Sequence, residues 1–258
     1  MPSSRYERAA RKAGHRVIAG IDEAGRGALF GPVFAGAVVL DPDRPIRGLD
    51  DSKQLEPERR EVLAGRIRER AIAWGVGAAD AFEIDRVNIL QAARLAMKRA
   101  VQQLDCKLSS KCDYLLVDAV SVDVPIPQRV LIHGDALCFS IAAASILAKT
   151  ARDAALREWD RVFPEYRLFS NKGYGSPEHL SALERVGPTA LHRFSFEPVR
   201  NVSKFIVWTG YPMLKTAEAL KITKAPGIAD AREPSEESVQ PSKPSKKPRL
   251  PLALAACP

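Results

Sequence analysis

Four acidic residues stand at or just past the ends of predicted strands, although they are far apart in the sequence. They are Asp22, Glu23, Asp118 and Asp135. Strands of one sheet bring their ends together, so these carboxylates can meet in one cleft, where they repel each other unless a cation neutralises them. Hard oxygen ligands of this kind suit Mg²⁺ or Mn²⁺. Two such ions about 4 Å apart can hydrolyse a phosphodiester by activating water and stabilising the leaving oxygen.

A simpler interpretation of these acids stays open, because solvated acidic residues are common at strand ends. The apolar run 114–117 precedes Asp118, and an aspartate in that place often caps a turn. Asp22 and Glu23 raise a geometric difficulty, because neighbours on a regular strand point to opposite faces. They can share a site only if the chain turns there, and the glycines at 25 and 27 favour such a turn.

The run Gly25-Arg26-Gly27 has the composition of a loop whose backbone N–H groups face a phosphate or a ribose. It is not a dinucleotide-binding fingerprint, because Phe30 stands where the third glycine is required. The sequence also has no G-K-[ST] run of a phosphate-binding loop, which argues against a nucleotide-binding α/β domain. A plain tight turn remains the alternative.

The elements that must position these residues follow an α/β order with an antiparallel start. Hydrophobic patterning predicts strands over residues 17–22, 33–40, 74–79, 114–117 and 129–132, the first two close to a hairpin. It predicts helices over residues 57–73, 84–104 and 139–159, and one more that begins at Ser176-Pro177. The third of these helices is rich in small residues, which would let it lie close against a sheet.

The whole chain has an ordinary globular composition, with 258 residues, 46% hydrophobic and 27% charged. No run of about 18 apolar residues and no secretion signal is visible, so we expect a cytoplasmic protein that does not span a membrane. The four cysteines form no C-x-x-C pair and no zinc-like grouping. A net charge of +8 favours nucleic acid as partner. Proline recurs among Ser, Lys and Glu over residues 225–258, which predicts a disordered tail.

Seven motifs in order make the chain resemble bacterial ribonuclease HII between residues 17 and 199. They read G-I-D-E-A-G-R-G-A-L-F-G-P (20–32), L-D-D-S-K (49–53), E-I-D-R-V-N-I-L-Q-A (83–92), L-L-V-D (115–118), G-D-A-L-C-F-S-I-A-A-A-S-I-L-A-K (134–149), N-K-G-Y-G-S (171–176) and H-R-F-S-F-E-P-V (192–199). Arg152-Asp153 and His179 also fit the pattern.

The resemblance implies a ribonuclease H-like fold, a mixed five-stranded sheet flanked by helices with a small helical C-terminal extension. We therefore expect a catalytic domain over residues 15–160, the extension over 161–215 and the tail over 225–258. It also implies an endonuclease that cuts the RNA strand of RNA–DNA hybrids. Such an enzyme incises duplex DNA 5′ of a single ribonucleotide, leaving 3′-hydroxyl and 5′-phosphate ends, as a step in DNA repair. A monomer is the expectation that follows from the family.

Position by position, the resemblance assigns the four carboxylates to the metal-binding and catalytic set, with Mg²⁺ or Mn²⁺ as cofactor. It makes Gly25, Arg26 and Gly27 the loop that senses the ribose 2′-hydroxyl, the group that distinguishes RNA from DNA. It makes Tyr174 the residue that stacks on the next sugar and prefers deoxyribose. Three basic residues are further candidates for phosphate contact, although a solvated surface role is open for each: Lys53, Lys172 and Arg193.

Two departures from the family pattern put fine loop geometry in doubt: Ala119 in place of glycine, and Leu168 with Phe169 ahead of Lys172. Ribonuclease HIII is a rival, but it has a longer N-terminal domain and a different glycine loop. A hybrid-binding protein without catalysis is a second rival, against which the four carboxylates argue. The tail shows no clamp-binding pattern of glutamine, aliphatic and paired aromatic residues.

Overall fold

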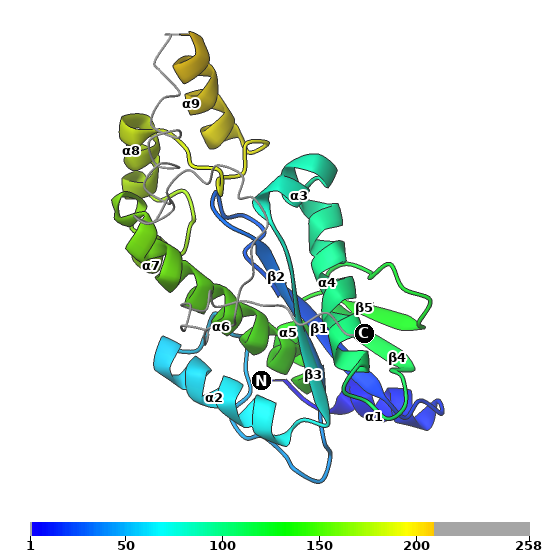
Figure 1. Cartoon of the computed structure of the whole chain (residues 1–258). Coiled ribbons are helices and arrows are strands. Elements are labelled where there is room, and N and C mark those ends of the chain that lie inside the picture. Colours follow the sequence, from blue (N-terminus) through cyan, green and yellow to red (C-terminus); the bar gives the residue numbers. More distant parts are fainter. Residues whose placement is uncertain (1, 209–258) are drawn as a thin grey trace, which may run out of the picture.

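A computed structural model describes residues 2–208. They form one five-stranded sheet flanked by helices (Figure 1). The strands are β1 (Ile18–Ala24), β2 (Val33–Val39), β3 (Ala73–Ala79), β4 (Tyr114–Asp118) and β5 (Gln128–Leu131), in the order β3-β2-β1-β4-β5. β1, β2 and β3 pair antiparallel, whereas β4 pairs parallel with both β1 and β5. The structure confirms the predicted mixed sheet and its opening hairpin.

Two long helices cover the two faces of the sheet (Figure 1). Helix α6 (Phe139–Val162) packs on β1 and β2 with α2 (Pro57–Arg70) beside it, and α4 (Ile89–Asp105) packs on β2 and β3. The approach of α6 is close, because a Cβ added to Gly36 would lie 2.3 Å from the carbonyl oxygen of Ala144. The alanines and serines predicted to permit this approach are buried in α6.

One long helix predicted over residues 84–104 is in fact two helices. Helix α3 (Ala81–Val87) ends at Asn88, whose φ of 70° interrupts the helical backbone, and α4 begins at Ile89. The side chain of Asn88 accepts hydrogen bonds from the backbone of Leu90 at 3.0 Å and of Gln91 at 3.1 Å. The sequence conceals this break, because apolar residues continue at helical spacing across it.

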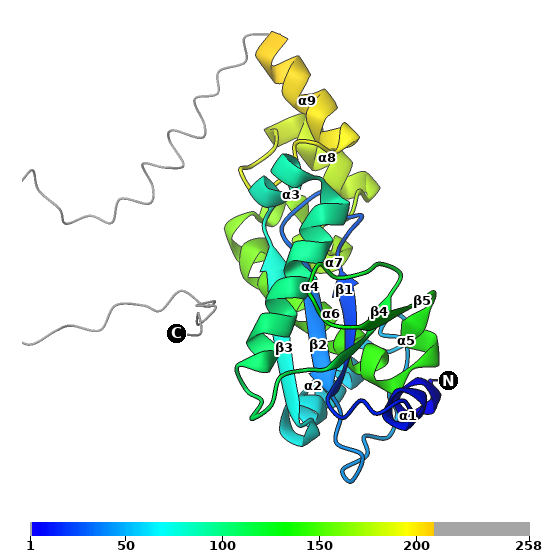
Figure 2. The same cartoon turned by 90° about the vertical axis from the view of Figure 1, so that its right-hand side faces the viewer.

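The remaining helices flank the sheet at its two ends. They are α1 (Arg5–Lys12), α5 (Gly134–Leu137), the 3₁₀ turn η1 (Pro164–Tyr166), α7 (Leu168–Asn171), α8 (Pro177–Val186) and α9 (Glu197–Trp208). In both views α8 and α9 lie beyond the end of the sheet where β1 passes into β2 (Figures 1 and 2). Ser176 caps α8 as predicted, accepting from the backbone of His179 at 3.3 Å.

The helices after α6 share a hydrophobic cluster with the β1–β2 connection. Phe30 is fully buried there among Leu156, Tyr166, Leu168 and Leu183. The expected boundary between residues 160 and 161 falls inside α6, and the predicted tail over 225–258 lies outside the described residues. Among residues 2–208, no helix is long and apolar enough to cross a membrane.

Candidate active site

The predicted carboxylates come from β1, β4 and α5 and meet at one end of the sheet. β1 and β4 are parallel neighbours, and Ile21 pairs with Val117, so Asp22 and Asp118 follow at the same level. Asp135 lies in the short helix α5, not directly at the end of a strand as the sequence had indicated. Asp118 ties this helix to β4, because its Oδ1 accepts a hydrogen bond from the backbone of Gly134 at 2.6 Å.

Asp22 and Glu23 lie on the regular strand β1, and the turn that the sequence predicted between them is absent. β1 stays paired with β2 through Ala24, so the turn begins only after both acids. Their side chains therefore leave opposite sides of the strand. The charge of Asp118, at the end of β4, contributes to raising the pKa of both Asp22 and Glu23.

The electrostatics of the site favour a bound cation. Burial, followed by the charges of Glu23, Asp118 and Asp135, raises the pKa of Asp22 well above its usual range. Burial also raises the pKa of Glu23, against the lowering effect of Arg26, and it raises the pKa of Asp135. The Oε2 atom of Glu23 is buried without a hydrogen-bond partner. An orphaned carboxylate oxygen among repelling acids fits a hard divalent ion.

The side chains do not stand as a finished metal-binding cluster. In the part of the chain that the structure describes, no three His, Cys, Asp or Glu side chains are grouped closely enough to hold a metal ion. Two of the acids are drawn instead toward basic neighbours. Glu23 lies 3.2 Å from the guanidinium of Arg26, and Asp135 lies 3.6 Å from the ammonium of Lys53. The carboxylate donors suit a divalent ion, and Glu23 and Asp135 would have to leave these basic partners in order to bind it.

The glycine loop and Tyr174 meet beside the carboxylates. Gly25 has φ of +95°, and a Cβ there would lie 2.1 Å from Nε of Arg152, so both backbone and space require glycine. A Cβ on Gly27 would lie 3.8 Å from Cε1 of Tyr174. The Tyr174 side chain is 43% exposed, and Arg152 lies 5.5 Å from its ring centre. Gly27 and the Tyr174 ring therefore lie close together, and their joint role at the substrate stays a prediction.

The three candidate phosphate contacts have different positions. Lys53 is exposed beside Asp135, and its contact with a phosphate stays a prediction. Lys172 is half-buried, with its ammonium 4.3 Å from the centre of the Phe169 ring. Arg193 is fully buried, and its guanidinium donates to the backbone oxygens of Gly31 and Arg26, so the prediction of a surface phosphate contact is wrong for this residue. Through these two hydrogen bonds Arg193 stabilises the glycine loop from inside the protein.

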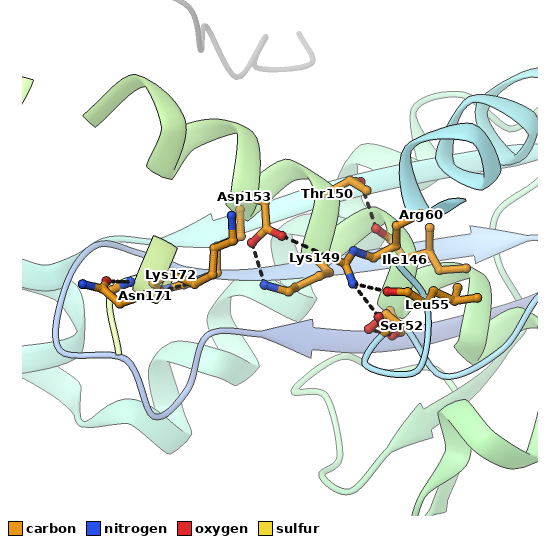
Figure 3. Close-up of polar contacts among 12 residues, drawn as sticks. Ser52, Leu55, Arg60, Ile146, Lys149, Thr150, Asp153, Asn171 and Lys172 are labelled. Carbon is orange, nitrogen blue, oxygen red and sulfur yellow. Dashed lines mark hydrogen bonds and ion pairs between the residues drawn. The ribbon is translucent and has the colours of Figure 1, made fainter. Parts of the chain in front are cut away.

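A buried ion-pair network behind the site was not assigned a role from the sequence (Figure 3). Asp153 lies 3.4 Å from the guanidinium of Arg60 and 2.6 Å from the ammonium of Lys149. Arg60 in turn donates to the backbone oxygens of Ser52 at 2.7 Å and Leu55 at 2.9 Å, which fixes the segment that carries Lys53. The only signal in the sequence was Arg152-Asp153 within the family resemblance.

The arrangement of helices and strands is shared with known proteins. The chain is similar in structure to ribonuclease H2 from Pyrococcus horikoshii OT3, with a TM-score of 0.60 and 25% sequence identity over 73% of this chain and 98% of that one. It shares the fold alone with Bst-RNase HIII in complex with Mn²⁺, at a TM-score of 0.64 and 19% identity over 76% of this chain and 72% of that one. This fold places the chain among proteins of the ribonuclease H type.

The particular family follows from sequence comparison. A family model described as Ribonuclease HII matches residues 19–199. Ribonuclease HII of Solibacter usitatus (strain Ellin6076) is 63% identical over 77% of this chain and 86% of its own length, and that of Koribacter versatilis (strain Ellin345) is 55% identical over 76% of each. The chain belongs to the ribonuclease HII family. It is therefore an endoribonuclease that cuts the RNA strand of RNA–DNA hybrids, in a family that depends on divalent metal ions.

Proposed function

We propose that this enzyme incises duplex DNA on the 5′ side of a single embedded ribonucleotide, as well as cutting longer hybrids. The observation that carries the proposal is the close approach of the Tyr174 ring to the glycine loop, where a Cβ added to Gly27 would lie 3.8 Å from the ring. The Gly25–Gly27 backbone can sense one 2′-hydroxyl, while the Tyr174 ring next to Gly27 can stack on the following sugar. A site that reads two successive sugars separately can select a ribose followed by a deoxyribose.

The four carboxylates are proposed to supply the chemistry at this point. Asp22, Glu23, Asp118 and Asp135 would hold Mg²⁺ or Mn²⁺, and such ions activate water and stabilise the leaving oxygen in phosphodiester hydrolysis. The orphaned oxygen of Glu23 and the raised pKa of Asp22 support this assignment. Attack on the phosphorus 5′ of the ribonucleotide leaves a 3′-hydroxyl and a 5′-phosphate, ends that DNA repair can use.

Lys53 is the basic residue proposed to contact the substrate backbone. Its side chain is 78% exposed and lies beside Asp135, where a phosphate held at the carboxylates would come within reach. Lys172 is a weaker candidate, because burial lowers its pKa and its ammonium faces Phe169. Arg26 already pairs with Glu23 and would have to release it to reach a phosphate.

The direct test uses a labelled DNA duplex that contains one ribonucleotide. The expected product ends on the 5′ side of that ribonucleotide, appears with Mg²⁺ or Mn²⁺ and disappears with EDTA. The Asp118→Asn variant should bind the duplex without cutting it. Cleavage confined to long RNA tracts would overturn the proposal while leaving the hybrid nuclease activity in place.

A further inference from the structure

Two adjacent buried residues connect the glycine loop with Tyr174 from behind. His192 and Arg193 are fully buried, and His192 pairs with Phe30 in an isolated antiparallel bridge. Neighbours in extended backbone direct their side chains to opposite sides. Arg193 accordingly reaches the β1–β2 connection, where it donates to Gly31 at 2.9 Å and to Arg26 at 2.8 Å. His192 faces the other way, toward α8.

The hydrogen bonds of His192 and His179 fix both tautomers. A backbone N–H can only donate, and that of Thr189 lies 2.9 Å from Nδ1 of His192, so this nitrogen is the acceptor. The proton of neutral His192 is then on Nε2 and is donated to Nε2 of His179 at 3.1 Å. His179 must carry its own proton on Nδ1, which donates to the carbonyl oxygen of Tyr174 at 2.9 Å. Three hydrogen bonds thus run in one direction.

The chain of donors ends on the residue that faces the substrate. The Tyr174 carbonyl accepts from His179 and, at 2.8 Å, from the backbone of Ser176. The imidazoles are enclosed by aromatic rings, with Phe30 4.9 Å and Tyr166 4.8 Å from His192 between ring centres. Such packing leaves the histidines little freedom to shift. The position of the Tyr174 backbone is therefore set from the rigid interior.

We propose that His192 and His179 are positioning residues that hold Tyr174 in register with the glycine loop, and so set the preference for a deoxyribose after the ribonucleotide. His192 and Arg193 are adjacent in the chain, and the hydrogen bonds of His192 form a relay through His179 to Tyr174, whereas those of Arg193 lead to the glycine loop. The same short segment therefore positions both the tyrosine and the loop. This inference rests on the proposed function, because it concerns selectivity at the embedded ribonucleotide. It adds residues that do not touch the substrate.

Two substitutions of His179 separate positioning from mere packing. Asparagine places an amide nitrogen near the position of Nδ1 and keeps a donor for Tyr174, whereas glutamine places its amide near Nε2 and loses that donor. We compare kcat/KM on the embedded ribonucleotide with kcat/KM on a uniform hybrid. His179→Gln should lower this ratio roughly tenfold, the factor that one hydrogen bond is worth, while His179→Asn should lower it by less than about threefold. Melting temperatures of both variants are measured to check that each variant is folded.

The relay also makes a prediction that does not depend on the substrate. Nitrogen-15 NMR of the wild-type enzyme should show a proton on Nδ1 of His179 and on Nε2 of His192. The opposite tautomers would overturn the relay outright. Equal ratios for the two variants would also overturn it, provided that the wild type incises normally. A wild type that never incises at the embedded ribonucleotide would instead refute the proposed function and the selectivity role together.

A double-mutant comparison checks that the effect passes through the tyrosine. In a Tyr174→Ala background, His179→Gln should no longer change the ratio, because the ring that it positions is gone. A further tenfold fall in that background would mean that His179 acts by another route, and the inference would be wrong.

Discussion

The ammonium of Lys53 lies 3.6 Å from Oδ2 of Asp135, so an exposed cation lies next to a buried carboxylate of the candidate site. Burial works to lower the pKa of Lys53, but the charges of Asp135, Asp51 and Asp22 outweigh it and raise that pKa. The lysine is therefore charged at every working pH. Arg60 in turn donates to the backbone oxygen of Ser52, which anchors the segment from which the Lys53 side chain extends.

Replacing Lys53 with alanine should weaken substrate binding through the loss of one phosphate contact. We expect the slope of log K against log salt for a hybrid to become shallower by about one. KM should rise roughly tenfold with a smaller change in kcat. Lys111→Ala is the control, because Lys111 is exposed and precedes β4, away from the end of the sheet that carries the acids. Identical slopes for both variants would show that Lys53 does not contact the backbone.

The break at Asn88 should be measurable as stability. Asn88 is exposed, adopts φ of 70° and caps α4, so alanine there loses the cap and strains the backbone. We expect Asn88→Ala to lower the free energy of unfolding by about 2 kcal/mol. Asn88→Gly tolerates the positive φ and should cost only a few tenths of a kcal/mol. Urea unfolding of the two variants measures both values, and an alanine variant more stable than the glycine variant would contradict the reason given.

Asn88 and Arg193 show why part of the molecule was hidden in the sequence. Strand patterning and the family motifs predicted the sheet, which the structure confirms, whereas the joint role of the four carboxylates stays a prediction. An asparagine that ends one helix and starts the next leaves the apolar spacing intact, so only the backbone shows the break. An arginine next to a histidine gives no sign of whether it is buried, and its neighbours at residues 26 and 31 are set by the tertiary fold.

Breaking the buried pair of Arg60 and Asp153 should cost far more stability than breaking a surface pair of the same helix α6. Asp153→Asn leaves a buried guanidinium without its counter-charge, which we expect to cost about 3–5 kcal/mol. The control is Arg161→Ala, which removes an exposed pair with Glu158 at 2.9 Å and should cost less than about 1 kcal/mol. Urea unfolding at pH 7 compares them. Similar losses would mean that Arg60 finds other partners.

The two buried histidines should make the protein lose stability in acid. Burial, followed by the charge of His179, lowers the pKa of His192 to about 3. The pKa of a histidine in the unfolded chain is about 6.5. Below that pH the unfolded chain therefore binds a proton that His192 in the folded chain does not bind. Between about pH 6.5 and pH 3 this one group should cost about 1.4 kcal/mol per pH unit.

The His192→Asn variant isolates this effect from other titrating groups. Asparagine keeps an acceptor for the Thr189 N–H but does not titrate. The difference in unfolding free energy between wild type and variant, measured from pH 7 to pH 5, should therefore slope in favour of the variant as the pH falls. The acids of the active site contribute equally to both proteins and cancel. A difference that stays constant with pH would refute the neutral buried histidine.

Asp22→Asn should make the metal-free protein more stable while it abolishes cleavage. Burial and the neighbouring carboxylates raise the folded-state pKa of Asp22, so the stability of the protonated form is lost as the pH rises through that pKa. At pH 7 in EDTA the variant lacks the repelling charge and should melt above the wild type.

With Mg²⁺ at about 100 times its Kd, the wild type should gain about 2.7 kcal/mol by mass action, and the variant much less. Turnover should fall roughly 100-fold or more, since a metal ion stabilises the transition state by several kcal/mol. A variant that melts below the wild type in EDTA would contradict the raised pKa of Asp22, and one that gains as much stability from Mg²⁺ would show that Asp22 does not bind the metal.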